Sequence, residues 1–527
     1  MKRIPLVSIK SWRLPRISLV PSPRAQLICL VSLGVILRLV WLAYTNFTYD
    51  DAFITFKYAQ NLASGQGFVY NVGERIYGIT SPLFALLLAG WLRTFHGDIL
   101  LGARIIGLLA AIGAQVMAWS TLGQLKITGG QRLVALAVFA LSDKLWLKDT
   151  GGMETPIIIF LMMTAWYASV RNWPIRAGIA TGLLLWTRID LAVWAVVLVG
   201  FSWYAKKRPP ILLIVAIGFI YLPWLGFATS YFGSPVPHTL TAKWIAYIGH
   251  DHSPLLEHLL TIVRWLTPFT LPDNWIGWQY ALAGATISLA AFGVVNVRRG
   301  EKLAILAVFG ILELILLTLI RATFEDRYFV PLWWITLLLC GLGVGTIWKL
   351  LGSSAFIRLS AVPAIMAVLL VGLTMGYQQA LIERDKQLYR NDAALKPIGL
   401  WLNQHTHPGA TVLLEPLGYI GYYADRDMID EVGLISPQVV DLMRQGVDRL
   451  GVISLIEPDY FVVHCDDVLG FLSRSDNHDF STHYMCTIVF NPLGFDPAGY
   501  NQSGLQRSSC YEIWSHELTP SITYQTP

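Results

Sequence analysis

Two adjacent carboxylates, Asp50 and Asp51, stand directly after the first apolar run of the chain, Leu27–Tyr44. A charged pair at a membrane boundary is costly unless it is hydrated or paired. One carboxylate could act as a general base that takes a proton from a hydroxyl, while the other orients a group or binds a cation. The alternative is structural, because aspartate before Ala-Phe-Ile-Thr-Phe also suits the start of a helix.

Further charged side chains stand at the ends of later apolar runs. Several cations facing one membrane surface could hold the phosphate of a lipid, because ammonium and guanidinium groups pair with phosphate oxygens. Structural alternatives remain, since Arg188 and Asp190 could simply pair with each other. Glu154 could only favour a helix N-terminus, and a single histidine is more often structural than catalytic. The candidates are Glu154, Arg188, Asp190, His238, Lys243 and Arg327.

The composition indicates that these residues sit in a membrane protein. Of 527 residues, 54% are hydrophobic and only 14% are charged, with a mean hydropathy of +0.52. Soluble domains carry about 25% charged residues. These values exclude a soluble enzyme, a disordered chain and a coiled coil, and they predict a multi-pass protein in the lipid bilayer.

Charge is distributed unevenly along the chain. Residues 1–377 have a balance of +15 and residues 378–527 a balance of −10, which together give the net +5. A basic membrane region is therefore followed by an acidic region that we expect to face water. No run of Lys and Arg with interleaved aromatic residues suggests a surface for nucleic acid.

The apolar runs predict about eleven transmembrane helices. Residues 1–24 hold six basic residues and no acid, so the positive-inside rule places the N-terminal segment, 1–26, on the cytoplasmic side. The membrane itself is expected to be the cell membrane. The membrane domain is 27–377, with a first extracytoplasmic loop at 45–99 in which Pro82–Phe95 does not cross. The runs lie at 27–44, 100–122, 131–148, 155–170, 175–187, 188–204, 211–229, 281–297, 303–320, 328–348 and 358–377.

The tail, 378–527, is predicted to be an extracytoplasmic soluble α/β domain. A polar helical stretch at 378–403 precedes alternating apolar runs at Ala410–Leu414, Val452–Ile456 and Tyr460–His464, which are separated by turn signals. Three cysteines follow at positions 465, 486 and 510. In an oxidising compartment they allow one disulfide with one thiol left over.

Two classes of function fit these observations. The chain has no phosphate-binding Gly-x-x-x-x-Gly-Lys-Ser/Thr loop, no His-Glu-x-x-His motif, and no cytoplasmic segment long enough for a nucleotide-sugar domain. An enzyme that faces outward would therefore need a lipid-linked donor. The alternative is a transporter or flippase of a lipid-linked sugar, which often shows an inverted repeat that we do not find here.

The first loop also resembles a known family. Residues 50–62 read DDAFITFKYAQNL and residues 65–83 read GQGFVYNVGERIYGITSPL. This pattern is similar to polytopic GT-C glycosyltransferases, most of all to the terminal arabinofuranosyltransferases of mycobacterial cell walls. Later segments agree over most of 27–465: GGMET (151–155), YFGSPVPHT (231–239), RYFVP (327–331), GYIGYY (418–423) and IDEVGLI (429–435).

The resemblance implies a GT-C fold and an inverting transfer of a monosaccharide from a polyprenyl-phosphate donor. The acceptor would be a hydroxyl of a cell-surface glycan, lipid or protein, with Asp50 or Asp51 as the base. No metal ligand set is implied, and the need for a divalent cation stays open. Lys57 replaces the usual Arg and His238 the usual Asn, so the sugar also stays open. By position, Lys57, Arg188, Lys243 and Arg327 would bind the donor phosphate, and Glu154, Asp190 and His238 the substrate.

Overall fold

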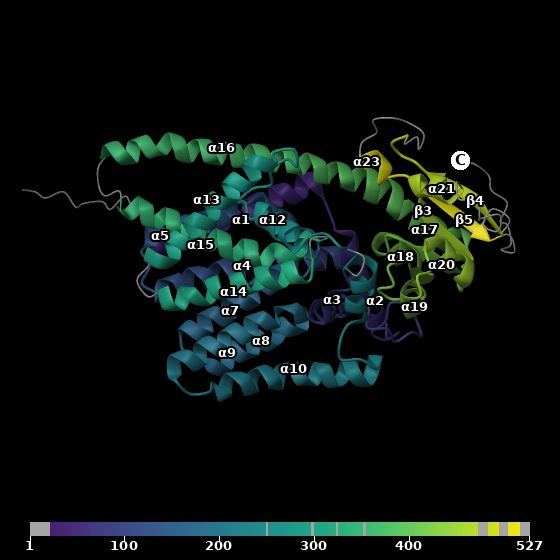
Figure 1. Cartoon of the computed structure of the whole chain (residues 1–527), viewed down its shortest axis with the longest axis horizontal. Helices are drawn as coiled ribbons and strands as arrows, with labels where there is room; N and C mark the ends of the chain where they lie inside the picture. The colour runs from purple at the N-terminus through teal and green to yellow at the C-terminus, as the bar shows by residue number, and fades with distance from the viewer. Residues whose placement is uncertain are drawn as a thin grey trace, which may run out of the picture.

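The chain consists of a bundle of long helices and a smaller mixed domain at one end of that bundle (Figure 1). The computed structural model describes residues 22–248, 251–296, 300–322, 325–350, 355–472, 483–494 and 504–516. The predicted N-terminal segment 1–26 thus lies almost entirely outside the described residues. Helix α16 (Ala355–Asp385) runs along the bundle and leads into the mixed domain through η5 (Lys386–Leu395) and α17 (Lys396–His405).

Among the described residues, each of the eleven predicted apolar runs falls mainly on helix, and one of them is interrupted. Seven described helices are long and apolar enough to cross a membrane, or up to eight if a bent pair counts as one span. The bundle helices are α1 (Pro23–Thr45), α4 (Ile99–Gln124), α5 (Gly129–Leu141), α7 (Thr155–Val170), α8 (Pro174–Thr187), α9 (Ala192–Lys206), α10 (Ile211–Phe232), α13 (Ile276–Asn296), α14 (Gly300–Leu319), α15 (Val330–Leu350) and α16.

One predicted boundary is wrong. The run 131–148 was expected to form a single helix, but the chain breaks at Ser142 between α5 and the short helix α6 (Asp143–Thr150). The Ser142 hydroxyl donates to the carbonyl of Pro268 at 2.8 Å, and Asp143 and Lys144 follow at once. Helix α6 then meets α7 at a bend of 107°, which brings its charged residues to the end of the bundle beside the tail.

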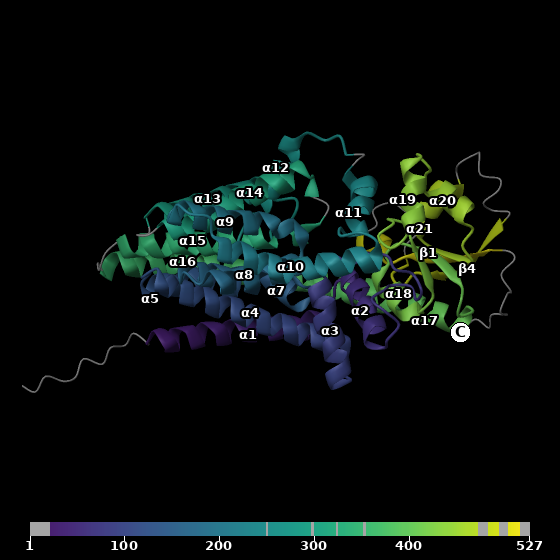
Figure 2. The same cartoon turned by 90° about the horizontal axis from the view of Figure 1, so that it is seen from below.

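The first loop folds into two short helices, α2 (Asp50–Ala63) and α3 (Pro82–Phe95). Helix α3 has the predicted bounds and runs across the direction of the spanning helices (Figure 2). Helix α2 is buried along most of its length, and no side chain caps its first turn. Asp50 and Asp51 are the first two residues of that helix, so both carboxylates stand at its N-terminus.

The tail contains a five-stranded sheet with the order β2-β1-β3-β5-β4. The parallel strands are β1 (Thr411–Leu414), β2 (Asp427–Asp430) and β3 (Tyr460–His464), and β4 (Tyr484–Phe490) and β5 (Tyr511–His516) are antiparallel. The α/β prediction is confirmed, but Val452–Ile456 is not a strand. It is the end of helix α20 (Arg449–Ile456), whose Asp448 side chain caps the helix N-terminus by accepting the Gly451 N–H.

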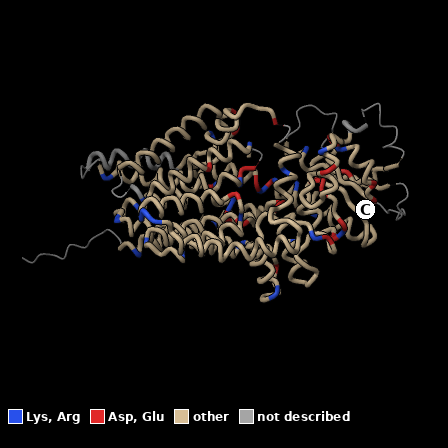
Figure 3. The backbone as a smooth tube through the Cα atoms, turned by 60° about the horizontal axis from the view of Figure 1, so that its bottom comes forward, with Lys and Arg blue, Asp and Glu red and all other residues tan. Residues whose placement is uncertain are grey.

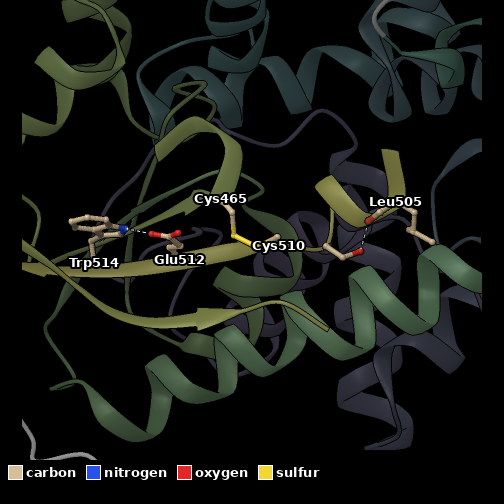
Figure 4. Close-up of a disulfide and its surroundings, with 6 residues drawn as sticks. Cys465, Leu505, Cys510, Glu512 and Trp514 are labelled. Atoms are coloured by element: carbon tan, nitrogen blue, oxygen red, sulfur yellow. Dashed lines mark hydrogen bonds between the residues drawn. A yellow bond between two sulfur atoms is a disulfide. The ribbon is translucent and has the colours of Figure 1, made fainter. Parts of the chain in front are cut away.

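A disulfide joins Cys465, at the start of α21 (Cys465–Leu472), to Cys510 beside β5 (Figure 4). Their Cα atoms lie 5.5 Å apart, and Cys486 is left as a free thiol. The expectation of one disulfide and one remaining thiol in the tail is confirmed. Such bonds persist in oxidising compartments outside the cytoplasm.

The tail is docked tightly on the first loop through helix α18 (Gly418–Ala424). A side-chain carbon at Gly418 would lie 1.9 Å from the carbonyl oxygen of Asp50, and one at Gly421 would lie 2.1 Å from the hydroxyl of Tyr70. Only glycine allows so close an approach at these positions. The ring of Tyr419 then packs on Phe53 with 4.0 Å between the centroids.

Candidate active site

The two adjacent aspartates have different surroundings. The carboxylate of Asp50 accepts the backbone N–H groups of Gly418 at 3.0 Å and of Tyr419 at 2.8 Å, at the start of α18. Burial raises the pKa of Asp50 to about 6, although Arg390 and these two N–H groups act to lower it. Asp50 is thus held by the tail.

Asp51 is held instead by cations of the bundle. One of its carboxylate oxygens lies 2.7 Å from a terminal nitrogen of Arg327, whose Nε lies 3.0 Å from Glu325. Burial acts to raise the pKa of Asp51, but the charges of Arg327 and Lys243 outweigh it and keep the pKa below its usual value. Asp51 is therefore ionised at neutral pH and stands beside two cations.

The remaining cations of this group meet around Tyr328, in the short helix η4 (Asp326–Phe329). The Nζ of Lys243, in α11 (His238–Lys243), lies 3.4 Å from the Tyr328 hydroxyl and 3.7 Å from Glu325. The Arg188 guanidinium lies 4.4 Å above the Tyr328 ring. Arg188 also forms an ion pair with Asp190, as expected for two charges so close in sequence.

These residues line two adjoining hollows. The first, the central cavity, has a volume of about 290 Å³ and lies between the bundle, α2 and the tail; Asp51, Lys243 and Arg327 line it. The second, the side cavity, has about 90 Å³ and is lined by Glu154, Arg188, Asp190, Lys243 and Arg327. Because Lys243 and Arg327 line both, the two hollows meet at these two cations.

Two predicted site residues lie elsewhere. Lys57 forms an ion pair with Asp425 of the tail at 2.5 Å and lines neither hollow. His238 also lines neither, and its backbone N–H donates to the carbonyl of Tyr77 at 2.8 Å. Burial lowers the pKa of its ring, and its Nε2 has no hydrogen-bond partner among the described residues.

Six charged residues that are not among the predicted site residues also line the central cavity: Lys148, Glu325, Asp326, Arg390, Glu415 and Asp430. Lys148 was hidden in a predicted span, and it forms an ion pair with Asp326. Arg390 lies in η5, a π-helical segment of a kind that occurs often at functional sites. Asp430 lies in the IDEVGLI segment, whose resemblance to the family pattern was a sequence signal for a functional role. Lys148, Arg390 and Glu415 carried no such signal, because they meet around one cavity only when the tail packs against the bundle.

The described residues contain no group of three or more His, Cys, Asp or Glu side chains arranged to hold a metal ion. Two acids of the central cavity face basic residues instead. Asp51 faces Arg327, and Asp326 faces Lys148. The arrangement can hold an anion and accept a proton at one place.

Comparisons with known proteins bear on the tail and on the whole chain. Residues 381–514 match a family model described as a domain of unknown function (DUF8728). No curated protein matches the chain. Among solved structures, ArnT from Cupriavidus metallidurans bound to undecaprenyl phosphate is similar, with 12% identity, a TM-score of 0.59, and coverage of 94% of this chain and 98% of that one.

Two further structures are similar. The Archaeoglobus fulgidus oligosaccharyltransferase, tethered to an acceptor peptide, has 11% identity and a TM-score of 0.52, with 84% of this chain and 69% of that one covered. The mycobacterial arabinofuranosyltransferase AftD has 16% identity and a TM-score of 0.47, with 94% and 40% covered, and that likeness carries no argument here. The first two likenesses extend over most of this chain. They show that it has the GT-C fold of membrane glycosyltransferases.

Proposed function

We propose that this protein is an integral membrane glycosyltransferase that moves a monosaccharide from a polyprenyl-phosphate donor to a hydroxyl acceptor. One observation carries the proposal: an ionised carboxylate, Asp51, lies 2.7 Å from Arg327 and beside Lys243 in a cavity at one end of the bundle. A general base and a phosphate-binding cation pair are the two components that such a transfer needs.

The donor phosphate would bind where the central and side cavities meet. Arg327 presents a planar fork suited to phosphate oxygens and Lys243 a compact charge, with Arg188 behind Tyr328. Phosphate binding would replace part of the ion pairing of Arg327 with Asp51 and Glu325. Asp51 would then lose a counter-charge and become a stronger base only when the donor is in place.

The reaction follows from this placement. The acceptor oxygen forms a bond to the anomeric carbon of the sugar, while the bond from that carbon to the phosphate oxygen breaks. The proton of the acceptor hydroxyl passes to Asp51, and polyprenyl phosphate leaves with the bonding electrons. Attack from the face opposite the phosphate inverts the anomeric configuration. Arg327 and Lys243 stabilise the charge that develops on the leaving phosphate.

The orientation in the membrane belongs to the same proposal. Basic residues gather at the end of the bundle far from the tail (Figure 3), and Lys126, Arg171, Lys206 and Lys207 lie at turns between spanning helices. The positive-inside rule would place that end and the N-terminus in the cytoplasm. The tail, with its disulfide, would then lie outside the cell membrane.

Two further observations bear on the donor and the acceptor. The similar ArnT structure contains undecaprenyl phosphate, which supports a polyprenyl phosphate as the donor lipid. The motifs in the first loop resemble the mycobacterial arabinofuranosyltransferases, but Lys57 and His238 depart from that pattern, so we do not propose arabinose. The acceptor would be a glycan, a lipid or a protein at the cell surface.

The test is sugar transfer by the purified protein from a panel of polyprenyl-phosphate monosaccharides, with and without EDTA. We expect release of polyprenyl phosphate and a product with the opposite anomeric configuration. Loss of turnover in EDTA that added Mg²⁺ restores would establish a divalent cation as a cofactor. Retention of the anomeric configuration would contradict the proposed mechanism.

The competing function is transport or flipping of a lipid-linked sugar. It predicts movement of the intact donor between the leaflets of a vesicle, with the bond between sugar and phosphate unbroken. That result without any release of polyprenyl phosphate would replace the proposal.

A further inference from the structure

A third and larger cavity lies on the far side of the central cavity from Arg188. Its volume is about 560 Å³, within the range of sites that bind small molecules. It lies where α6, α12 (Leu255–Trp265), α13 and α16 meet η5, at the junction with the tail (Figure 1). We call it the basic cavity because of the charges that line it.

Five basic side chains line the basic cavity against three acidic ones. Two of the acids are paired, Asp326 with Lys148 and Glu383 with Lys386, and the third is Asp273. The remaining basic residues are Lys144, Arg264 and Arg390. The cavity therefore has an excess of positive charge after its internal ion pairs are formed.

None of these three cations forms an ion pair with a described residue, although Arg390 hydrogen-bonds to Tyr511 and its charge acts on Asp50. Lys144 donates to two neutral oxygens, the carbonyl of Trp265 at 2.7 Å and the hydroxyl of Thr267 at 2.9 Å. The Nε atoms of Arg264 and Arg390 are buried and have no hydrogen-bond partner among the described residues. A buried donor without a partner costs free energy that an anionic ligand would recover.

The rest of the lining suits a sugar. Trp265 and Trp333 offer aromatic rings. The amide nitrogens of Gln279 and Gln379 donate within the protein, to two backbone carbonyls and to Glu383. The buried amide oxygen of Gln279 has no partner among the described residues and is free to accept from a hydroxyl. Sugars present apolar ring faces and many hydroxyls, and aromatic and amide groups match both. A long apolar chain would leave the amide oxygen of Gln279 and the buried Nε atoms without partners.

The basic cavity adjoins the central cavity but not the side cavity. Tyr49, Lys148, Asp326 and Arg390 line both the basic and the central cavity, whereas no described residue lines both the basic and the side cavity. Asp51 thus stands in the hollow that connects the other two. A ligand of the basic cavity would reach Asp51 from the side opposite the donor phosphate.

We infer that the basic cavity binds the acceptor, and that the acceptor is a sugar with a phosphate or carboxylate group. The inference rests on the proposed function, because it assigns the donor phosphate to Lys243 and Arg327. The anionic group pairs with Arg264 and Arg390, the sugar ring packs on the tryptophans, and a hydroxyl reaches Asp51 past Lys148.

The test is calorimetric binding to the full chain in phosphatidylcholine nanodiscs. The probes are glucose 6-phosphate, glucuronate, glucose and inorganic phosphate, with farnesyl phosphate as a donor mimic. We expect the two anionic sugars to bind about tenfold or more tightly than glucose, which corresponds to one charge-assisted contact. Arg264→Gln should remove that advantage, and Arg264→Lys should restore part of it.

Two controls separate the basic cavity from the donor site. Arg93→Gln, on the exposed surface of α3, should change no binding constant. Arg327→Gln should weaken farnesyl phosphate and leave glucose 6-phosphate unchanged. Loss of farnesyl phosphate binding in Arg264→Gln would instead assign the basic cavity to the donor and overturn the inference.

Other outcomes are equally decisive. Equal binding of glucose and glucose 6-phosphate would overturn the inference, as would inorganic phosphate that binds as tightly as glucose 6-phosphate. None of these measurements requires turnover. The inference about the cavity can therefore fail while the panel of donors shows transfer, and it can hold while the panel shows none.

Discussion

The two walls of the central cavity hold their acids in different ways. On the bundle side Asp51 and Glu325 contact Arg327. The pKa of Asp51 is lowered because the charges of Arg327 and Lys243 outweigh the effect of burial. On the tail side burial raises the pKa of Asp430 to about 8 and also raises the pKa of Glu415. One wall is therefore charged at neutral pH, and Asp430 on the other wall is protonated.

This difference suits the proposed chemistry. Paired charges on the bundle wall can exchange a carboxylate for a phosphate at little electrostatic cost, because the cations keep an anionic partner throughout. A protonated Asp430 on the opposite wall does not repel that phosphate. The tail can close the cavity over an anion although its overall charge is negative.

The difference between the two walls has the proposed functional meaning only if Asp51 is the base. Asp51→Asn keeps the shape of the side chain and removes its ability to take a proton, so we expect turnover to fall by about 10²–10⁴-fold. Transfer from the best donor of the panel measures this. Donor binding should persist, since Arg327 and Lys243 remain.

Asp50→Asn is the matched control because it alters the neighbouring carboxylate, which the tail holds. We expect it to keep most of the turnover. If Asp50→Asn lost activity and Asp51→Asn kept it, the roles of the two aspartates would have to be exchanged.

A smaller effect is expected from Arg327→Lys. Lysine keeps the positive charge but cannot contact Asp51 and Glu325 together as the guanidinium does, so the KM for the donor should rise by about tenfold. The kcat should change less, and steady-state kinetics separate the kcat from the KM for the donor.

Arg321→Gln, in the same connection between α14 and α15 and paired with Asp251, should leave both constants unchanged. An equal rise in KM for both variants would remove the specific role of Arg327.

Much of this arrangement could be predicted from the sequence, because its signals are local. The apolar runs gave the helices, and the bounds of α3 were correct. Asp51, Arg188, Lys243 and Arg327 stand at the ends of such runs, where a charge is conspicuous.

The tail's contribution could not be predicted in this way. Asp50 and Gly418 meet across 368 positions of the chain, and no local pattern reveals such a contact. The difference between adjacent aspartates depends on it. Arg390 lies in a polar stretch and Glu415 directly after an apolar strand, and both acquire a role only when the tail docks. The break at Ser142 was missed because it depends on a carbonyl at Pro268.

Asp50 is also expected to hold the tail against the first loop. Asp50→Ala would leave the N–H groups of Gly418 and Tyr419 without their acceptor, which costs about 1–3 kcal/mol for a buried group. We expect a lower Tm and faster proteolytic separation of the tail from the bundle. Asp441→Asn, which removes the charge of an exposed ion pair with Arg444 in the tail, should cost less than about 1 kcal/mol. If both substitutions had the same small effect, Asp50 would not hold the tail.

The smallest expected effect concerns the pH dependence of the tail wall. The pKa of Asp430 is about 8 in the folded protein and 3.8 for an ordinary aspartate, so folding takes up a proton between these values. Stability must then fall as the pH rises from about 4 to 8, because the folded state disfavours the ionised form.

Asp430→Asn resembles the protonated acid and cannot ionise. Wild type and variant should therefore have similar Tm values near pH 4, and at pH 9 the variant should melt about 2 °C or more above wild type. Asp441→Asn, on the exposed side of α19 (Pro437–Arg444), should follow the wild-type curve at every pH. Parallel curves for wild type and Asp430→Asn would mean that Asp430 is ionised like Asp51, and the two walls would then carry acids of the same kind.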